Sequence, residues 1–118
     1  MHIVIKNKTK DIIISGEYID LKAAVESHKD DLCYADLNNA NLSNTNLEHA
    51  NLSSSKLLGT NLRGANLRDA NLSGANLRDA DLRSADLSCS NLVDVDLTNA
   101  DLRGANLLGA NLRGAFRS

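Results

Sequence analysis

Leucine recurs at every fifth position from Leu32 to Leu112, seventeen times without exception, and from Leu37 onward the residue two positions before each leucine is small, alanine in eleven of sixteen cases, except at Val95. On an α-helix, leucines five residues apart advance by about 140° each and spread around the surface, so no single apolar face forms. On a straight strand, the odd spacing sends successive leucines to opposite faces. Within one pentad, however, the small residue and the leucine point the same way in an extended segment. A chain that turns after each leucine encloses all of them around one axis, so the pattern predicts a solenoid.

The second residue after each leucine predicts where the chain turns. In the pentads from 35 to 114 it is glycine six times, asparagine three times and aspartate three times. These residues tolerate positive φ or hydrogen-bond to their own backbone in turns. Asparagine or aspartate stands directly before the leucine in all of these pentads except that of Lys56. We expect it to point outward or to brace adjacent turns through side-chain to backbone hydrogen bonds.

The first 29 residues do not follow the repeat. Two β-branched runs, at 2–6 and 11–15, flank the polar segment NKTK and predict a β-hairpin. Asp20 is a suitable N-cap for a short amphipathic helix over residues 21–28. Terminal repeats of a solenoid need a cover for their exposed interior and unpaired edges, so we expect this segment to cap the first coil.

The pentads, such as ANLRG and ADLNN, resemble those of the pentapeptide-repeat family, whose pattern is a small residue, Asp or Asn, Leu and two variable residues. The resemblance implies an all-β fold, a right-handed quadrilateral β-helix of about four coils with four pentads in each. We expect two units: residues 1–29 as an N-terminal β-hairpin and helix cap, and residues 30–118 as the β-helix. The expected structural core consists of Leu37, Leu42, Leu47, Leu52, Leu57, Leu62, Leu67, Leu72, Leu77, Leu82, Leu87, Leu92, Leu97, Leu102, Leu107 and Leu112.

Composition adds little chemistry to this picture. The 118 residues carry a formal net charge of −2, and neither a signal peptide nor a membrane-spanning segment is recognisable, so we expect a cytoplasmic protein without a membrane partner. Cys33 and Cys89 are nearly three coils apart, beyond the reach of a disulfide, and are expected to be free thiols.

The titratable residues do not predict a reaction. His2, His28 and His49 show no metal-ligand spacing with each other or with the cysteines. Outward carboxylates on a solenoid are solvated unless a cleft encloses them. We therefore expect no catalytic, cofactor-binding or metal-binding residues, and a non-enzymatic role as a structural or protein–protein interaction module of unknown partner.

Stacking in coils of twenty residues aligns Arg63, Arg83 and Arg103 on one side as a candidate interaction stripe. Asp81 and Asp101 are expected to compensate part of its charge. A docking strip for an acidic partner is one interpretation, and a solubilising face of alternating charge is the other. Without aromatic side chains for base stacking, direct nucleic-acid binding is not expected.

The repeat stops after Gly114, where an uncovered last coil would present apolar atoms and unpaired strand edges. We expect an end-to-end homodimer with Leu107, Leu112 and Phe116 at its interface, or alternatively a monomer in which Phe116 folds under the coil as a plug.

The family resemblance suggests a further alternative, because some pentapeptide-repeat proteins mimic a DNA duplex and bind DNA gyrase or topoisomerase. Residues 35–114 hold nine acidic and seven basic residues, a net charge of −2, which is weak for a phosphate mimic.

Overall fold

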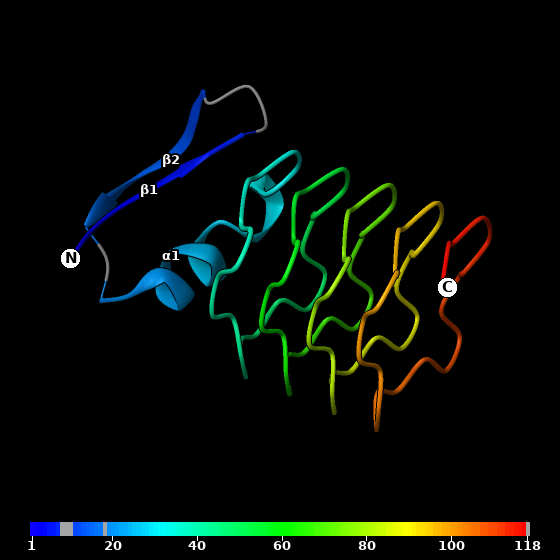
Figure 1. Cartoon of the computed structure of the whole chain (residues 1–118). Coiled ribbons are helices and arrows are strands. Elements are labelled where there is room, and N and C mark those ends of the chain that lie inside the picture. The colour runs from blue at the N-terminus through cyan, green and yellow to red at the C-terminus, as the bar shows by residue number, and fades with distance from the viewer. Residues whose placement is uncertain (8–10, 18, 118) are drawn as a thin grey trace.

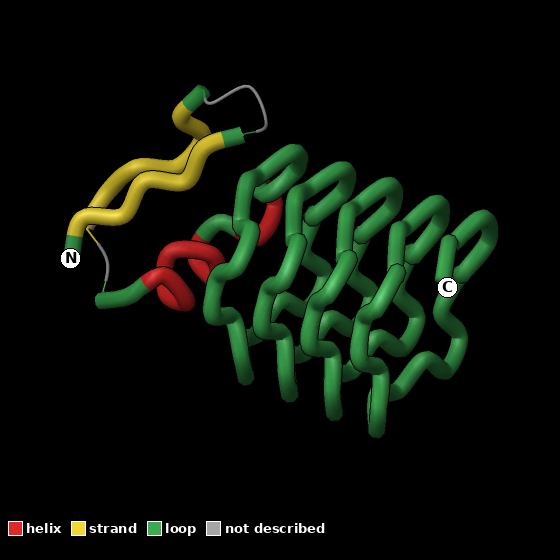
Figure 2. The backbone as a smooth tube through the Cα atoms, viewed as in Figure 1, coloured by secondary structure: helices red, strands yellow, loops and turns green. Residues whose placement is uncertain are grey.

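The computed structural model describes residues 1–7, 11–17 and 19–117. A two-stranded hairpin and a short helix lie at one end of a column of stacked coils, and the C-terminus lies at the other end (Figures 1 and 2). In chain order the elements are β1 (His2–Lys6), β2 (Ile12–Glu17), α1 (Leu21–Ser27) and a 3₁₀ helix (Lys29–Asp31), followed by the coils.

The hairpin forms where the β-branched runs predict it. Strands β1 and β2 are antiparallel, with Ile5 opposite Ile14. Ile3 and Ile5 alternate with exposed neighbours along β1 and are 8% and 3% exposed, so one face of the hairpin joins the core. Most of the predicted NKTK turn lies outside the described residues.

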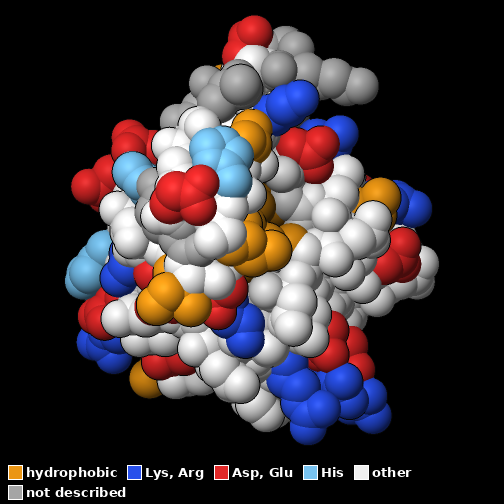
Figure 3. Space-filling model, turned by 90° about the vertical axis from the view of Figure 1, so that its left-hand side faces the viewer, with side chains coloured by type: hydrophobic (Ala, Val, Ile, Leu, Met, Phe, Trp, Pro, Cys, Tyr) orange, Lys and Arg blue, Asp and Glu red, His pale blue; other side chains and the backbone are white. Residues whose placement is uncertain are grey.

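Helix α1 begins as predicted, because the Oδ1 atom of Asp20 accepts a hydrogen bond from the backbone N–H of Ala23 at 2.8 Å. It ends at Ser27, one residue earlier than expected, since the φ of −130° at His28 is not helical. Ala24 and Val25 are fully buried in the same core. Seen from this end, hydrophobic side chains lie near the centre of the molecule and charged side chains of both signs lie around them (Figure 3).

The repeat forms a right-handed quadrilateral β-helix. Parallel bridges join residues twenty apart, as between Asn61 and Asp81, so four pentads complete one coil. The backbone N–H of Leu62 donates to the next coil at Asp81 (2.8 Å), and that of Asn61 donates to the previous coil at Ala40 (2.9 Å). Inside the column, the leucines from Leu32 to Leu92 are at most 4% exposed. Each pentad is therefore tied to its neighbours on both sides, while its leucine fills the shared interior.

The predicted corners are confirmed. Seventeen residues, each the second after a leucine, have φ between 56° and 75°. At one of them, Gly64, the N–H of Ala65 donates to the carbonyl of Leu62 at 3.0 Å and closes a four-residue turn. Eleven of the seventeen corners are not glycine, and they include His49 and Cys89.

Asparagine and aspartate before the leucines brace the turns, as expected. The Oδ1 atom of Asn61, for example, accepts from the backbone N–H of Arg63 at 3.0 Å. At the exceptional position Lys56 this acceptor is missing, and the Oδ1 atom of Asn38 in the preceding coil replaces it by accepting from the N–H of Leu58 at 2.9 Å. A neighbouring coil thus supplies the acceptor that the pentad of Lys56 lacks.

Candidate functional site

The side of the column that carries the candidate stripe is a network of paired charges. Asp81 accepts from Arg83 Nε and Nη2 at 2.9 and 2.7 Å, and one coil further Asp101 accepts from Arg103 Nε and Nη2 at 2.9 and 2.6 Å. Arg83 Nε also lies 3.7 Å from Asp101 Oδ2, which links the two pairs along the column. We call these four residues the Arg–Asp ladder.

The pairing acts on the protonation of the ladder. Hydrogen bonds from the Arg103 side chain lower the pKa of Asp101 to about 2, and those from Arg83 lower the pKa of Asp81. In turn, the carboxylates raise the pKa of both guanidinium groups. All four groups are therefore charged at neutral pH, and their charges cancel within the ladder.

Arg63 lies on the same side one coil earlier, but Asn61 replaces the aspartate before its leucine. The Asn61 Oδ1 atom accepts from the backbone of Arg63, and the Arg63 side chain has no ion pair with any residue that the structure describes. The structure thus aligns Arg63, Arg83 and Arg103 in one row, in which two of the three arginines are compensated.

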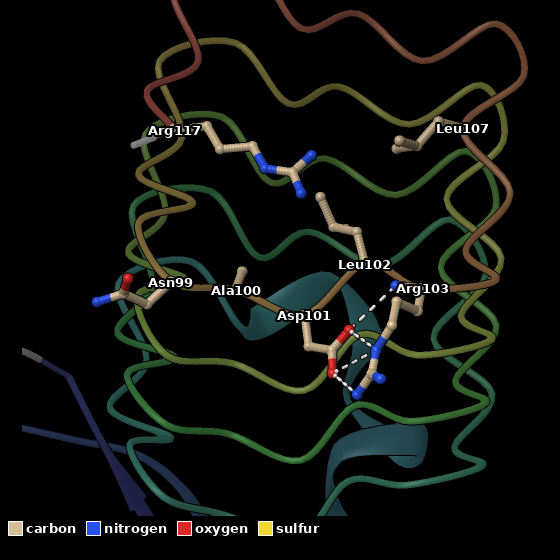
Figure 4. A pocket seen from close by; sticks show the side chains of 7 residues that line it. All are labelled: Asn99, Ala100, Asp101, Leu102, Arg103, Leu107 and Arg117. Atoms are coloured by element: carbon tan, nitrogen blue, oxygen red, sulfur yellow. Dashed lines mark hydrogen bonds and ion pairs between the residues drawn. The ribbon is translucent and has the colours of Figure 1, made fainter.

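The C-terminal end of the column is open. Its apolar pocket is lined by Leu97, Leu102, Leu107, Leu112, Ala115 and Arg117. In Figure 4, Arg117 and Leu107 extend toward each other from opposite sides and Leu102 points between them. Leu112 is 42% exposed, whereas the equivalent Leu72 and Leu92 in the coils before it are fully buried.

Phe116 does not plug this end. Its backbone pairs with the coil before, since its N–H donates to Val95 at 2.8 Å and its carbonyl accepts from Leu97 at 2.7 Å. That register places Phe116 at the outward position before a leucine site, and its side chain is 59% exposed. Arg117 occupies the interior position, where a further leucine would continue the core.

The last coil also leaves backbone groups unpaired. Within residues 1–7, 11–17 and 19–117, six N–H groups that would bond to a further coil have no backbone acceptor: those of Leu102, Gly104, Leu107, Gly109, Leu112 and Gly114. The carbonyls that would accept from such a coil are those of Ala100, Ala105, Ala110 and Ala115, and none of them has a backbone donor among the same residues. The open end thus combines apolar side chains with a sheet edge.

One cluster of titratable groups was not anticipated. His49 lies between two carboxylates, with its Nε2 atom 3.4 Å from Glu48 and its Nδ1 atom 3.8 Å from Asp69. His49 and Asp69 occupy the same corner in successive coils. The sequence signal that could have shown this is their separation of twenty residues, one full coil.

Both cysteines are free, as predicted. The Sγ atom of Cys33 lies 3.1 Å from Ser53 Oγ, whereas Cys89 is exposed at a corner. None of the described helices is long and apolar enough to cross a membrane.

Comparison with known proteins identifies the repeat. The pentapeptide-repeat family model matches residues 31–69, 60–99 and 80–116. A pentapeptide repeat protein from the thylakoid lumen of Arabidopsis thaliana is 34% identical with a TM-score of 0.76, and the match covers 85% of this chain and 68% of that one. Rfr23 from the cyanobacterium Cyanothece 51142 is 36% identical with a TM-score of 0.69, over 70% of this chain and 57% of that one. No curated protein matches by sequence. Because the family model spans most of the chain and a similar structure shares its fold, the chain belongs to the pentapeptide-repeat family.

Proposed function

We propose that this protein is a non-enzymatic interaction module that associates with a second copy of itself through the open C-terminal end. The observation that carries this proposal is the combination, at one end, of partly exposed core leucines with six unpaired backbone donors. An uncovered edge of this kind favours pairing with another chain.

A two-fold partner suits this edge because the edge carries both donors and acceptors. The carbonyl of Ala100 and the N–H of Leu102 lie two residues apart on one side, and the other sides repeat the arrangement. In a two-fold dimer, the donor of one copy can face the acceptor of the other, since both copies present the same surface. Leu107, Leu112 and Phe116 would then lie at the interface, where their burial stabilises the dimer.

Two substitutions in the last coil test the proposal. Leu112→Asp places a charge in the open end, whereas Leu108→Asp places the same charge on the outer side of the coil, where Leu108 is 78% exposed. By sedimentation equilibrium over a range of concentrations, we expect wild type and Leu108→Asp to dimerise and Leu112→Asp to remain monomeric. A wild-type monomer at all concentrations, or a dimer that survives Leu112→Asp, contradicts the proposal.

At the other end, we propose that residues 1–29 act as a cap for the β-helix of residues 30–118. Contacts between the two segments support this role: the N–H of Asp36 donates to Lys6 at 2.7 Å, and that of Asn51 donates to Lys29 at 2.8 Å. Val25 of α1 is fully buried in the core that the coils share. A covered N-terminal end directs association to the C-terminal end.

The stripe of Arg63, Arg83 and Arg103 is the second candidate surface. Its partner would be an acidic protein, but Asp81 and Asp101 already satisfy two of its three arginines. We would compare wild type with a variant that has alanine at all three positions in affinity capture. If neither retains a specific partner, the role of the stripe is limited to solubility.

DNA mimicry, the alternative role as a binder of gyrase or topoisomerase, requires a continuous acidic surface. Residues 35–114 carry a net charge of only −2, and the Arg–Asp ladder alternates in sign along one side. These observations favour the interaction module. Inhibition of gyrase supercoiling by the purified protein would reverse that preference.

We also propose a cytoplasmic location, which the two free thiols support because reducing compartments keep cysteines unpaired.

A further inference from the structure

We propose that Glu48, His49 and Asp69 form a binding site for one Zn²⁺ ion, which would bridge two successive coils. Each residue offers one ligand atom, and the three atoms lie within 4.8 Å of one another. The site lies away from the open end and does not depend on the proposed dimer.

The spacing of the cluster suits zinc. Bonds of about 2.0–2.2 Å in a tetrahedral site place the ligand atoms ~3.4 Å apart. His49 Nε2 and Glu48 Oε1 are 3.4 Å apart, and Asp69 Oδ2 approaches the other ring nitrogen to 3.8 Å. Because these two distances involve different ring nitrogens, the exposed His49 ring has to turn so that one nitrogen faces both carboxylates when the three ligands share one ion.

The backbone beneath the cluster is held in place on both sides. The N–H of His49 donates to the carbonyl of Arg68 at 2.9 Å, and the N–H of Asp69 donates to Ser88 at 3.0 Å in the following coil. Glu48 is also oriented, because its Oε2 atom accepts from Asn66 Nδ2 at 3.5 Å. Ligands on a rigid frame lose little freedom when an ion binds, which favours affinity.

The two carboxylates are not saturated by basic side chains. Arg68 Nε is 3.7 Å from Asp69 Oδ2, too long for a good hydrogen bond, and no lysine or arginine among the described residues pairs with Glu48. This differs from the Arg–Asp ladder, where bidentate contacts of 2.6–2.9 Å occupy the carboxylates. The lone pairs of Glu48 and Asp69 are therefore accessible to a cation.

The ligand types favour zinc over the hard cations. Mg²⁺ and Ca²⁺ prefer sites made wholly of oxygen, whereas an imidazole nitrogen with two carboxylates suits Zn²⁺. Cys89 follows Asp69 at the same corner, but its Sγ atom approaches the next corner, lying 3.3 Å from the position that a Cβ on Gly109 would take. The site therefore has three protein ligands and leaves the fourth position to water.

Calorimetric titration of the metal-free full-length protein with zinc chloride tests this site. The variants are His49→Asn and Asp69→Asn, because Asn occupies the same left-handed corner conformation at positions 39, 44 and 99. His28→Asn removes a histidine outside the cluster and is the matched control. We expect wild type and His28→Asn to bind one equivalent, and both cluster variants to bind at least about tenfold more weakly, in line with the loss of a ligand.

A second measurement distinguishes a specific zinc site between coils from nonspecific binding of zinc to the surface. Zinc should raise the thermal midpoint of wild type and of His28→Asn but not that of His49→Asn, since only an ion bound to the folded state stabilises it. Magnesium chloride at the same concentration should have no effect. Absence of saturable zinc binding in wild type, or equal affinity in wild type and His49→Asn, overturns the proposal, as does a loss of binding in His28→Asn alone.

Discussion

The two ends of the column differ although the same pentad builds both. At the N-terminal end, Leu32, Leu42 and Leu47 are fully buried and share one core cluster with Ala24 and Val25 of α1. At the C-terminal end, Leu112 is 42% exposed and lines an open pocket together with Arg117. An interior leucine is therefore fully buried only when other residues cover its coil on both sides along the column.

Backbone hydrogen bonding is also more complete at the N-terminal end than at the C-terminal end. In the first coil, segments before the repeat accept hydrogen bonds from Asp36 and Asn51, although Asn41 and Asn46 have no backbone acceptor among the described residues. In the last coil, none of the six leucine and corner N–H groups that face outward along the column is bonded to a backbone acceptor within that part of the chain. A repeat unit carries no information about where it should stop, so sequence outside the repeat has to supply the cover.

The largest test of this comparison places one charge at two equivalent positions. Leu72→Lys buries an ammonium group inside the column and should lower the free energy of unfolding by roughly 4 kcal/mol or more. Leu112→Lys occupies the same side of the last coil, where the long side chain can reach water, and should cost less than about 1 kcal/mol. Urea denaturation measures the free energy of unfolding of both variants. The protein concentration is kept as low as practical, because this limits association. Equal losses would contradict the difference between covered and open coils.

The N-terminal cover can be tested in the same way. Val25 is fully buried between α1 and the rest of the core, whereas Val4 on β1 is 42% exposed. We expect Val25→Asp to destabilise the fold by about 3 kcal/mol, because it buries a charge without a partner. Val4→Asp should change stability by about 0.5 kcal/mol at most. If thermal denaturation shows similar losses for both variants, α1 does not contribute to the core as the structure indicates.

Much of this fold follows from the sequence because its determinants are local. The five-residue period indicates a solenoid, and the glycine, asparagine and aspartate residues correctly mark the corner position, which has positive φ even where Ser84 or Cys89 occupies it. The hairpin and the Asp20 cap are also correct. The number of sides per coil does not follow from the period, since a turn after every leucine is compatible with several closed shapes. It came from the resemblance to the family.

Contacts between coils at variable positions could not be predicted from the pentad. His49 meets Asp69, and Asn38 reaches the pentad of Lys56, only because coils of twenty residues stack in register. Neither partner is marked by a local motif, and side-chain rotamers decide whether the contact forms. The Arg–Asp ladder is intermediate: each pair belongs to one pentad, but its continuation from Arg83 to Asp101 needs the stacked structure.

The contact that repairs the Lys56 pentad gives a smaller effect. Asn38→Ala removes the acceptor for the N–H of Leu58 and should cost about 1 kcal/mol. In a Lys56→Asn background, the restored asparagine can accept that N–H itself, and Asn38→Ala should then have little effect. A double-mutant cycle in urea measures the coupling between the two positions. Additive effects of the two substitutions would show that Asn38 does not replace the missing acceptor.

The smallest expected effect concerns the exposed charges of the last coil. Because hydrogen bonds from Arg103 lower the pKa of Asp101 from 3.8 to about 2, the ionised carboxylate favours the folded state above pH 3.8. That contribution should disappear as the pH falls through about 2, when Asp101 becomes protonated in the folded protein as well. Arg103→Gln removes the main hydrogen-bond donor and should raise the pKa of Asp101 toward its ordinary value.

A carboxyl NMR titration of wild type and Arg103→Gln measures this change at Asp101 itself, and Arg113→Gln is the control because Asn111 replaces the aspartate in its pentad. Since Arg103 is 77% exposed, solvent screens the ion pair and the accompanying change in stability at neutral pH should be small. An unchanged pKa in Arg103→Gln would mean that the ion pair does not persist in solution. The exposed charges at the open end would then not hold the last coil in place, whereas the buried leucines do so in the inner coils. Nor would these charges compensate for the missing neighbouring coil.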